Sequence, residues 1–238
     1  MRRSKKIIWV SSTPVFLPGQ KNKNYFREGW VQGIFNEIAL RNDIEMTVVS
    51  PVEWKEEIKK YAESDIYYRD FHTTVYTTQY EKATEEELYS IFHEIDPDII
   101  HLWGTERMYC LAVVNAAERL GMTNRIVVNI QGLISVFSRY FNLGIPEKYQ
   151  SGWSIPEFWC RTSLKKQEQE FEKRGDFEIQ ALEKVHYVIG RSDWDEICVK
   201  QINSKIQYFF CNEILRPSFY ESEKWDVERC ERHSIFIS

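Results

Sequence analysis

The chain has 238 residues, of which 43% are hydrophobic and 15% aromatic, enough to bury the core of one large or two small globular domains. Its formal net charge of -5 gives no general electrostatic reason to bind nucleic acid, because phosphate-binding surfaces usually carry an excess of lysine and arginine. The composition therefore argues against a disordered chain and against a nucleic-acid-binding protein.

The amino terminus and the cysteines indicate in which cellular compartment the protein works. MRRSKKIIWVSS has the basic head of a signal peptide, but Ser11 and Ser12 interrupt its short apolar run, so we interpret it as a first strand. No apolar stretch approaches the roughly 20 residues of a membrane-spanning helix. The five cysteines are widely spaced and form no CxxC pair, which favours a reducing compartment. We expect a cytoplasmic protein whose basic start could weakly contact the inner face of an anionic membrane.

The first part of the chain alternates strand and helix patterns. KIIWVSS and IEMTVVS are β-rich runs, and YFREGWVQGIFNEIALR between them places apolar residues on one helical stripe. EWKEEIKKYA then predicts a polar surface helix, and DIYYRDFHTTVYTT predicts an irregular strand region. TEEELYSIFHEI predicts a helix that starts with a capping box of Thr84 and Glu87.

The alternation continues after this helix. DPDIIHLWG predicts a buried strand, ERMYCLAVVNAAERLG a helix closed by Gly121, and NRIVVNIQG a strand of the apolar kind found in parallel sheets. Residues 133–155 mix aromatics and glycines without a period, which predicts a long functional or mobile loop. Residues 156–185 predict a helix broken at Gly175, and HYVIGR, SDWDEICVKQI and KIQYFF predict strand, helix and strand. We therefore expect an α/β fold with a doubly wound, Rossmann-like parallel sheet and helices on both faces.

Ligands of an open parallel sheet collect at the carboxyl ends of its strands. The loops that follow the predicted strands are SSTPVFLPGQ, WGTE, IQGLIS, GRSDWDE and FFCNEILRPSF, and they hold glycines, hydroxyls, charges and tryptophans that no core requires. We expect them to share one cleft. The chain has no GxSxG, GxGxxG, Walker or HExxH motif, and its five histidines lack ligand spacing. Metal and nucleophile chemistry is therefore disfavoured, and no catalytic residue is assigned.

The loops after the strands carry a resemblance to a known family. DIIHLWGTE, VVNIQGLIS, VIGRSDWDE and YFFCNEILRPSFYE, in this order and spacing, resemble the amino-terminal domain of a family 4 glycosyltransferase of the GT-B fold. GRSDWD and NEILRPSFY are the most specific parts. The resemblance implies an acceptor-side Rossmann-like domain over 1–215. It also implies, over 216–238, a linker and the first strand of a donor-binding domain, so that the chain would be shortened just past the boundary.

The sequence also departs from the family pattern. The family often has paired glycines before its first helix, but Gly29 here follows a glutamate. Family members often carry two histidines near the end of the fourth strand, whereas His101 here holds the first place and Trp103 the second. Glu170 and Glu178 have the spacing of the family's E-x7-E element, but that element belongs to the second domain. We attribute this pair to chance.

The resemblance implies a retaining enzyme that moves a sugar from a nucleotide-sugar donor to a saccharide or lipid-linked acceptor, without a cofactor or a required metal. We expect an acceptor site formed by Trp103, Gly104, Thr105, Glu106, Gln131, Gly132 and Arg139. We expect the cleft between the two domains to include Gly29, Arg191, Asp193, Asn212 and Glu213. The donor would be held mainly by the second domain, so these residues alone would be nearly inert.

Each of these residues also has a structural interpretation. Thr105 could cap a helix that Glu106 begins, and the helix dipole would then keep Glu106 ionised. Arg191 and Asp193 could pair with each other, and Trp194 could pack against the sheet instead of stacking on a sugar. At the level of the whole chain, the alternative is a non-catalytic α/β module that binds a carbohydrate or nucleotide. An α/β hydrolase or dehydrogenase would lack its required motifs.

Overall fold

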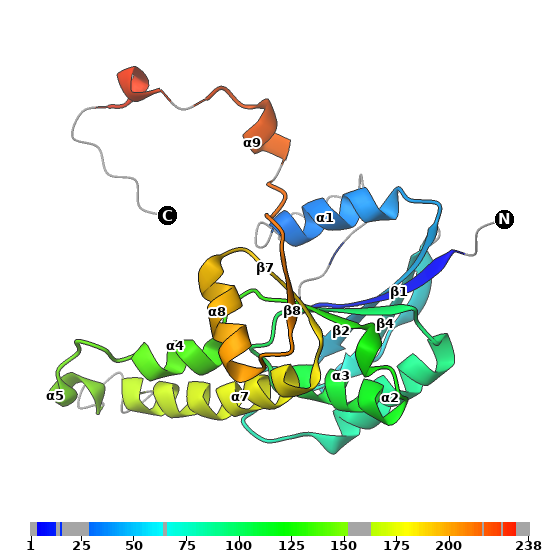
Figure 1. The fold of residues 1–238 in the computed structure, drawn as a ribbon, viewed down its shortest axis with the longest axis horizontal. Helices are drawn as coiled ribbons and strands as arrows, with labels where there is room; N and C mark the ends of the chain where they lie inside the picture. Colours follow the sequence, from blue (N-terminus) through cyan, green and yellow to red (C-terminus); the bar gives the residue numbers. More distant parts are fainter. Residues whose placement is uncertain are drawn as a thin grey trace.

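The computed structural model describes residues 4–12, 15, 29–63, 66–151, 163–215, 217–224 and 226–231. Within these residues, eight strands form one sheet in the order β3-β4-β2-β1-β5-β6-β7-β8 (Figure 1). All neighbouring strands run parallel except β3, which is antiparallel to β4 at one edge. The strands are β1 (Lys5–Val10), β2 (Ile44–Val52), β3 (Lys60–Glu63), β4 (Ile66–His72), β5 (Ile99–Trp103), β6 (Ile126–Asn129), β7 (Tyr187–Gly190) and β8 (Gln207–Phe210).

Helices cover both faces of this sheet, as the alternating pattern predicts (Figure 1). The helices are α1 (Gly29–Ala39), α2 (Lys82–Ile95), α3 (Met108–Arg119), α4 (Ile134–Tyr140), α5 (Glu147–Gln150), α7 (Leu164–Lys184), α8 (Asp193–Ile202) and α9 (Pro217–Glu221). Short 3-10 turns span Thr123–Arg125 and Val227–Arg229. The predicted fold class, a doubly wound α/β sheet, is confirmed. None of the described helices combines the length and apolar composition needed to cross a membrane.

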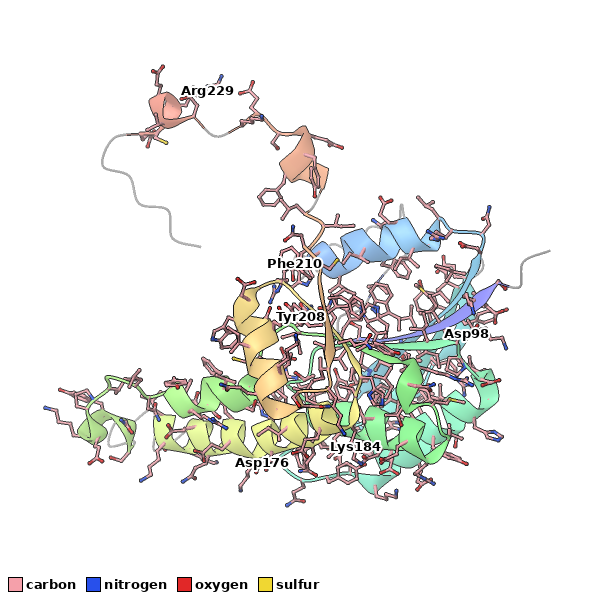
Figure 2. The ribbon with its side chains drawn as sticks, in the orientation of Figure 1. Asp98, Asp176, Lys184, Tyr208, Phe210 and Arg229 are labelled. Carbon is pink, nitrogen blue, oxygen red and sulfur yellow. The ribbon has the colours of Figure 1, made fainter. Side chains whose placement is uncertain are left out.

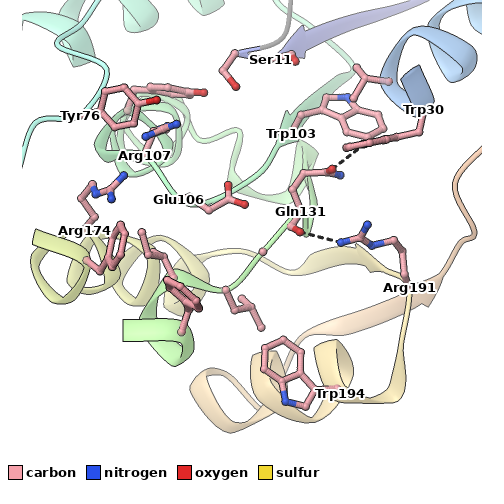
Figure 3. Close-up of a pocket in the computed structure, with 18 residues that line it drawn as sticks. Ser11, Trp30, Tyr76, Trp103, Glu106, Arg107, Gln131, Arg174, Arg191 and Trp194 are labelled. Atoms are coloured by element: carbon pink, nitrogen blue, oxygen red, sulfur yellow. Dashed lines mark hydrogen bonds between the residues drawn. The ribbon is translucent and has the colours of Figure 1, made fainter. Parts of the chain in front are cut away.

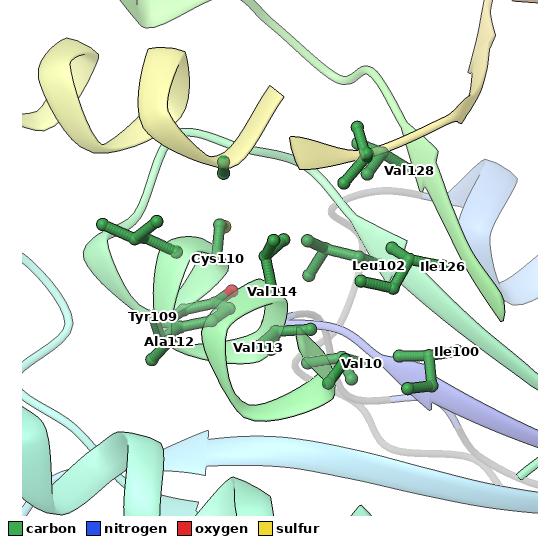
Figure 4. Close-up of a cluster of buried hydrophobic side chains, with 14 of the residues drawn as sticks. Val10, Ile100, Leu102, Tyr109, Cys110, Ala112, Val113, Val114, Ile126 and Val128 are labelled. Carbon is green, nitrogen blue, oxygen red and sulfur yellow. The ribbon is translucent and has the colours of Figure 1, made fainter. Parts of the chain in front are cut away.

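The two faces bury separate cores. On one face, Val31 and Phe35 of α1 pack with Trp9 of β1 and Val48 of β2. On the other face, α2, α3, α7 and α8 cover a larger core in which α3 is buried almost all round (Figure 4). Because β5 has helices on both sides, its apolar side chains are removed from water on both faces. This double burial explains why β5, with the sequence IIHLW, is mostly apolar on both faces.

Contacts of Tyr208 tie β8 to the end of β7 and the start of α8. Tyr208 and Phe210 lie on β8 (Figure 2), and the Tyr208 hydroxyl donates a hydrogen bond to the Ser192 carbonyl at 2.9 Å. The same hydroxyl accepts from the Ser192 amide at 3.3 Å. A Cβ at Gly190 would overlap the Tyr208 ring. A glycine is therefore required at the end of β7 for β8 to lie this close.

The predicted polar helix over EWKEEIKKYA is wrong. The segment ends in β3, which pairs with β4 in register, and the rings of Tyr61 and Tyr68 stack at 4.8 Å. Strand pairing and cross-strand stacking outweigh a weak local helix pattern that has no apolar stripe to bury. The region after it is also more regular than predicted, because β4 pairs with β2 over seven residues.

The predicted capping box is wrong as well. Helix α2 begins at Lys82, before Thr84, and the residue that precedes it is Glu81. The Thr84 hydroxyl donates to the His72 carbonyl at 2.8 Å, and Glu87 accepts from the His72 amide at 2.7 Å. Both side chains thus tie α2 to the end of β4 instead of capping the helix.

The predicted break of the long helix at Gly175 is wrong. Helix α7 is continuous, and a Cβ at Gly175 would lie 2.7 Å from the Cα of Ser135 in α4. The glycine allows two helices to approach closely, which offsets its low helix propensity. Part of the predicted loop over 133–155 is in fact helical, since it contains α4 and α5. The strand predicted in HSIFIS lies outside the described residues.

Candidate functional site

A pocket of about 720 Å³ opens at the carboxyl ends of β1, β5, β6 and β7 (Figure 3). Loops that lie far apart in the sequence meet there because the carboxyl ends of parallel strands share one edge of the sheet. Residues from four of the five predicted loops line this pocket, whereas FFCNEILRPSF contributes none of the lining residues. Its lining residues are Ser11, Ser12, Trp30, Val31, Tyr76, Trp103, Glu106, Arg107, Tyr109, Gln131, Gly132, Leu133, Ile134, Phe137, Phe171, Arg174, Arg191 and Trp194.

The carboxyl group of Glu106 lies between two glycines. Gly104 has a φ of +80°, and a Cβ there would overlap Oε2 of Glu106. A Cβ at Gly132 would lie 3.1 Å from Oε1. A side chain at Gly104 would therefore displace the carboxyl, and one at Gly132 would crowd it. The two glycines follow neighbouring strands, β5 and β6, and together they leave room for this acid at the pocket.

Glu106 is not at the start of a helix. Helix α3 begins at Met108, after Arg107 in extended conformation, so Thr105 does not cap a helix that Glu106 begins. Burial raises the pKa of the Glu106 carboxyl, and the charge of Glu178 adds to this. The backbone amides of residues 105 and 106 oppose the rise by donating to the carboxylate. The expectation that a helix dipole keeps Glu106 ionised is therefore wrong in direction.

Thr105 belongs to the support behind the pocket. It is fully buried, and its hydroxyl donates to Oε2 of Glu178 at 2.5 Å. The same carboxyl accepts from the amide of Ser135 at 2.9 Å, from its hydroxyl at 2.5 Å and from the Ile134 amide at 3.3 Å. Glu178 of α7 thus caps the first turn of α4, which has no side-chain cap of its own. Burial raises the pKa of Glu178, and these hydrogen bonds oppose the rise.

The position of Glu178 in the sequence indicates its structural role better than its spacing from Glu170 does. On α7 it shares one helical face with buried Gly175, Ala181 and Leu182. A single acid on an otherwise buried face must find hydrogen-bond donors in the core. That pattern predicts a structural carboxylate, which is the role the contacts assign to it.

A chain of hydrogen bonds links β6, α1 and the β7 loop. The Trp30 indole donates to the Gln131 side-chain oxygen at 2.9 Å, and the Gln131 amide donates to Asn129 Oδ1 at 2.6 Å. Arg191 donates to the Gln131 carbonyl at 2.8 Å (Figure 3). It also donates to Glu213 at 2.6 Å. Arg191 therefore pairs with Glu213 and not with Asp193. This network places Gln131 and Arg191 at one wall of the pocket.

Trp103 lies behind the same wall. It is only 4% exposed, and its ring stacks on Trp9 with centroids 4.9 Å apart. The ring of His101 stacks on Trp103 at 4.7 Å, and burial lowers the pKa of His101 to about 4. His101 is therefore neutral at pH 7 and is part of an aromatic column within the sheet, outside the pocket lining.

The remaining predicted residues lie outside the lining of the pocket. Arg139 is an exposed residue of α4, and Asp193 is exposed in the first turn of α8. Gly29 is the first residue of α1, and Asn212 is exposed just after β8. The structure thus brings Trp103, Glu106, Gln131, Gly132 and Arg191 together in the pocket lining, but not these four.

Three residues with charged or phenolic side chains, Tyr76, Arg107 and Arg174, are among the lining residues that were not predicted as site residues. Tyr76 precedes α2, Arg107 precedes α3, and Arg174 lies on α7. They converge at the end of the pocket away from Arg191 (Figure 3). Trp194 is 51% exposed at the pocket, so it does not pack against the sheet. Among the described residues no cluster of histidine, cysteine, aspartate and glutamate could hold a metal ion.

No family model matches the chain, and no curated protein matches its sequence. Sucrose-phosphate synthase from Thermosynechococcus elongatus is 12% identical with a TM-score of 0.49, over 87% of this chain and 47% of that one. An E. coli structure described as trehalose-6-phosphate bound with UDP-2-fluoro glucose is 11% identical with a TM-score of 0.42, over 84% and 43%. A short-chain dehydrogenase/reductase from Veillonella parvula in complex with NADP is 10% identical with a TM-score of 0.39, over 79% and 69%.

The chain thus spans about half the length of the first two of these proteins. At these identities and TM-scores, the likenesses assign neither a family nor a function to the chain.

Proposed function

We propose that this chain is the acceptor-binding part of a glycosyltransferase, which moves a sugar from a nucleotide-sugar donor to a saccharide or lipid-linked acceptor with retention at the anomeric carbon. The observation that carries the proposal is the carboxyl of Glu106, held between Gly104 and Gly132 and facing an aromatic-walled pocket. The sequence resemblance to family 4 glycosyltransferases supports the same proposal. The donor diphosphate would be held mainly outside these residues, and no metal or cofactor is required.

The pocket has the chemistry that binding a sugar hydroxyl requires. Aromatic side chains such as Trp30 and Phe137 offer apolar faces on which a sugar ring can stack. Glu106 can accept a hydrogen bond from the acceptor hydroxyl, and a charged partner makes such a bond strong. Its raised pKa also makes the carboxylate a better acceptor for the hydroxyl proton than an ordinary glutamate.

In the transfer itself, a bond forms between the acceptor oxygen and the anomeric carbon, and the bond from that carbon to the donor phosphate breaks. The nucleoside diphosphate leaves with the electron pair. The acceptor hydroxyl must lose its proton during this exchange, and the departing diphosphate, which gains the electron pair, would take it up. Glu106 would orient that hydroxyl, and the walls of the pocket would hold the acceptor in position.

The test is Glu106→Gln in the full-length gene product, which keeps the shape of the side chain and removes its charge. We expect the efficiency of sugar transfer to fall by a factor that corresponds to about 1 to 3 kcal/mol, because one charged hydrogen bond is lost. Donor affinity should stay close to that of the wild type. The measurement is transfer from labelled UDP-glucose and GDP-mannose to a panel of sugars and sugar phosphates.

Glu172→Gln is the matched control, because Glu172 is an exposed acid on α7 and does not line the pocket. It should transfer as the wild type does. Unchanged transfer in Glu106→Gln would remove Glu106 from the acceptor site. Sugar binding without any transfer would instead favour the non-catalytic binding module.

A further inference from the structure

Arg174 is a buried cation without a hydrogen-bond partner for its Nε. The residue is 6% exposed, it lines the pocket, and its Nε is buried and makes no hydrogen bond to any described residue. Its guanidinium lies over the Phe171 ring at 5.0 Å and over the Tyr76 ring at 5.8 Å. A buried guanidinium is costly unless a partner completes its hydrogen bonds.

Arg107 approaches the same ring from another element. Its guanidinium carbon lies 4.0 Å from the centroid of Tyr76, so two cations share one aromatic ring (Figure 3). Burial lowers the pKa of Arg174, and the charge of Arg107 lowers it further. Without an anion between them, the two guanidinium groups repel each other.

Several other arginines of the described chain are paired with acids. Arg119 pairs with Glu85 at 2.8 Å, Arg125 with Asp96 at 2.7 Å, and Arg191 with Glu213 at 2.6 Å. Neither Arg107 nor Arg174 forms such an ion pair within the part of the chain that the structure describes. Arg107 and Arg174 therefore differ from those three arginines, whose charges are paired with acids.

The nearest acids do not cancel this positive charge. Glu106 interacts with both arginines through space, but its carboxyl already accepts hydrogen bonds from the backbone amides of residues 105 and 106. Glu170 lies one turn before Arg174 on α7 and is exposed, so water screens its attraction to Arg174, and among the described residues its ion pair is with Lys166 at 3.9 Å. Both guanidinium groups thus keep donors that can face a ligand in the pocket.

From these contacts we propose that Arg107 and Arg174 form a phosphate-binding subsite at the end of the pocket away from Arg191. A planar guanidinium can donate two parallel hydrogen bonds to the oxygens of a phosphate. The ring of Tyr76 contacts both guanidinium groups and helps to hold them in position. A phosphate between them would remove their mutual repulsion and satisfy the buried Nε of Arg174.

The subsite also indicates the chemical class of the acceptor, and this extension rests on the proposed function. Glu106 lies between the two arginines and Arg191 in the same pocket (Figure 3). A ligand that fills the pocket would therefore place a phosphate at Arg107 and Arg174 and a hydroxyl at Glu106. The acceptor class is then a phosphorylated sugar or a lipid whose head group ends in a phosphate.

The first experiment uses the 238-residue chain and direct binding, which needs no transfer reaction. Calorimetry is run with inorganic phosphate, glucose 6-phosphate and glucose. We expect phosphate and glucose 6-phosphate to bind and glucose to bind at least tenfold more weakly. Arg107→Gln and Arg174→Lys should each weaken phosphate binding about tenfold or more, because a lysine cannot donate the paired hydrogen bonds of a guanidinium.

Lys173→Gln, at the exposed neighbouring position of α7, is the matched control and should bind phosphate as the wild type does. Arg107 is only partly buried, so its variant remains informative if Arg174→Lys unfolds. Equal binding of phosphate by the wild type and a folded Arg107→Gln would overturn the proposal, as would no binding at all.

A second arm distinguishes the two sources of phosphate. Phosphatidylcholine vesicles with and without phosphatidic acid are tested for retention of the chain. Retention that needs phosphatidic acid and Arg107 assigns the subsite to a lipid phosphate, and glucose 6-phosphate binding without such retention assigns it to a soluble one. Arginine-dependent phosphate binding would stand even if no sugar transfer were found, so a failure of the proposed function is separable from a failure of the subsite.

Discussion

At the scale of single residues, Glu106 shows how burial changes an ordinary acid. Its raised folded-state pKa means that the ionised form is less favourable in the folded protein than in the unfolded chain. This cost is absent below the ordinary value of 4.5, grows as the pH rises toward the folded-state pKa, and is fully present above it. The protein therefore gives up some stability at neutral pH to keep a carboxylate in the pocket.

The prediction at this scale concerns stability against pH. Glu106→Gln removes the ionisation cost, so its free energy of unfolding should exceed that of the wild type at pH 7. The difference should shrink as the pH falls toward 4, because the wild-type acid becomes neutral in both states. Urea unfolding of both proteins from pH 4 to pH 8 measures it. A difference that does not change with pH would contradict the raised pKa, and Glu172→Gln should show no such trend.

At the scale of elements, the wall of the pocket depends on how α4 lies against α7. Glu178 caps the first turn of α4, and Gly175 lets the backbone of Ser135 come close. Both contacts come from α7, whose next turn toward the amino terminus carries Arg174 and Phe171 into the pocket. The same helix thus supports the pocket from behind and lines it.

Gly175→Ala tests this packing. In most helix interiors a change from glycine to alanine stabilises, by about 0.5 to 1 kcal/mol. Here the new Cβ would lie 2.7 Å from the Ser135 Cα, so we expect a loss of about 1 to 3 kcal/mol in the free energy of unfolding. Chemical denaturation measures the change. Asp176→Ala, at the exposed next position, should be near neutral, and a stabilised Gly175→Ala would refute the close approach.

At the scale of the whole molecule, the parallel sheet gathers loops from four strands into one pocket, and each loop has a different task. The β5 and β6 loops hold Glu106, the β7 loop holds Arg191 against Glu213, and α7 supplies Arg174. Arg191 already donates hydrogen bonds to the Glu213 carboxylate and the Gln131 carbonyl, so it is not a free cation for a second phosphate group.

This arrangement of the pocket predicts how strongly the chain binds a nucleotide-sugar donor. In calorimetry, UDP-glucose and GDP-mannose should bind the 238-residue chain weakly or not at all, because we propose that the donor diphosphate is held mainly elsewhere. A dissociation constant near 1 μM, which corresponds to about -8 kcal/mol, would contradict this. A protein that contains the proposed donor-holding part should bind one of them, and Arg107→Gln serves as a control for weak phosphate binding at the proposed subsite.

Much of the framework follows from local pattern. The strands of the sheet except β3, and the long helices α1, α2, α3, α7 and α8, lie where apolar periodicity predicts them, because a core-facing stripe repeats with the period of its own element. The meeting of Gly104, Gly132 and Arg191 at one edge follows as well, since each comes directly after a predicted parallel strand.

What depends on contacts between distant segments was decided only by the tertiary structure. Strand β3 exists because β4 offers it backbone partners, although its own residues favour a helix. Glu106 gains its raised pKa from burial between two loops, and Glu178 finds its donors on another helix. Arg107 and Arg174 become neighbours only across Tyr76. A residue's pattern in the sequence reports which way it faces, whereas its protonation and its partners depend on what the folded chain places against it.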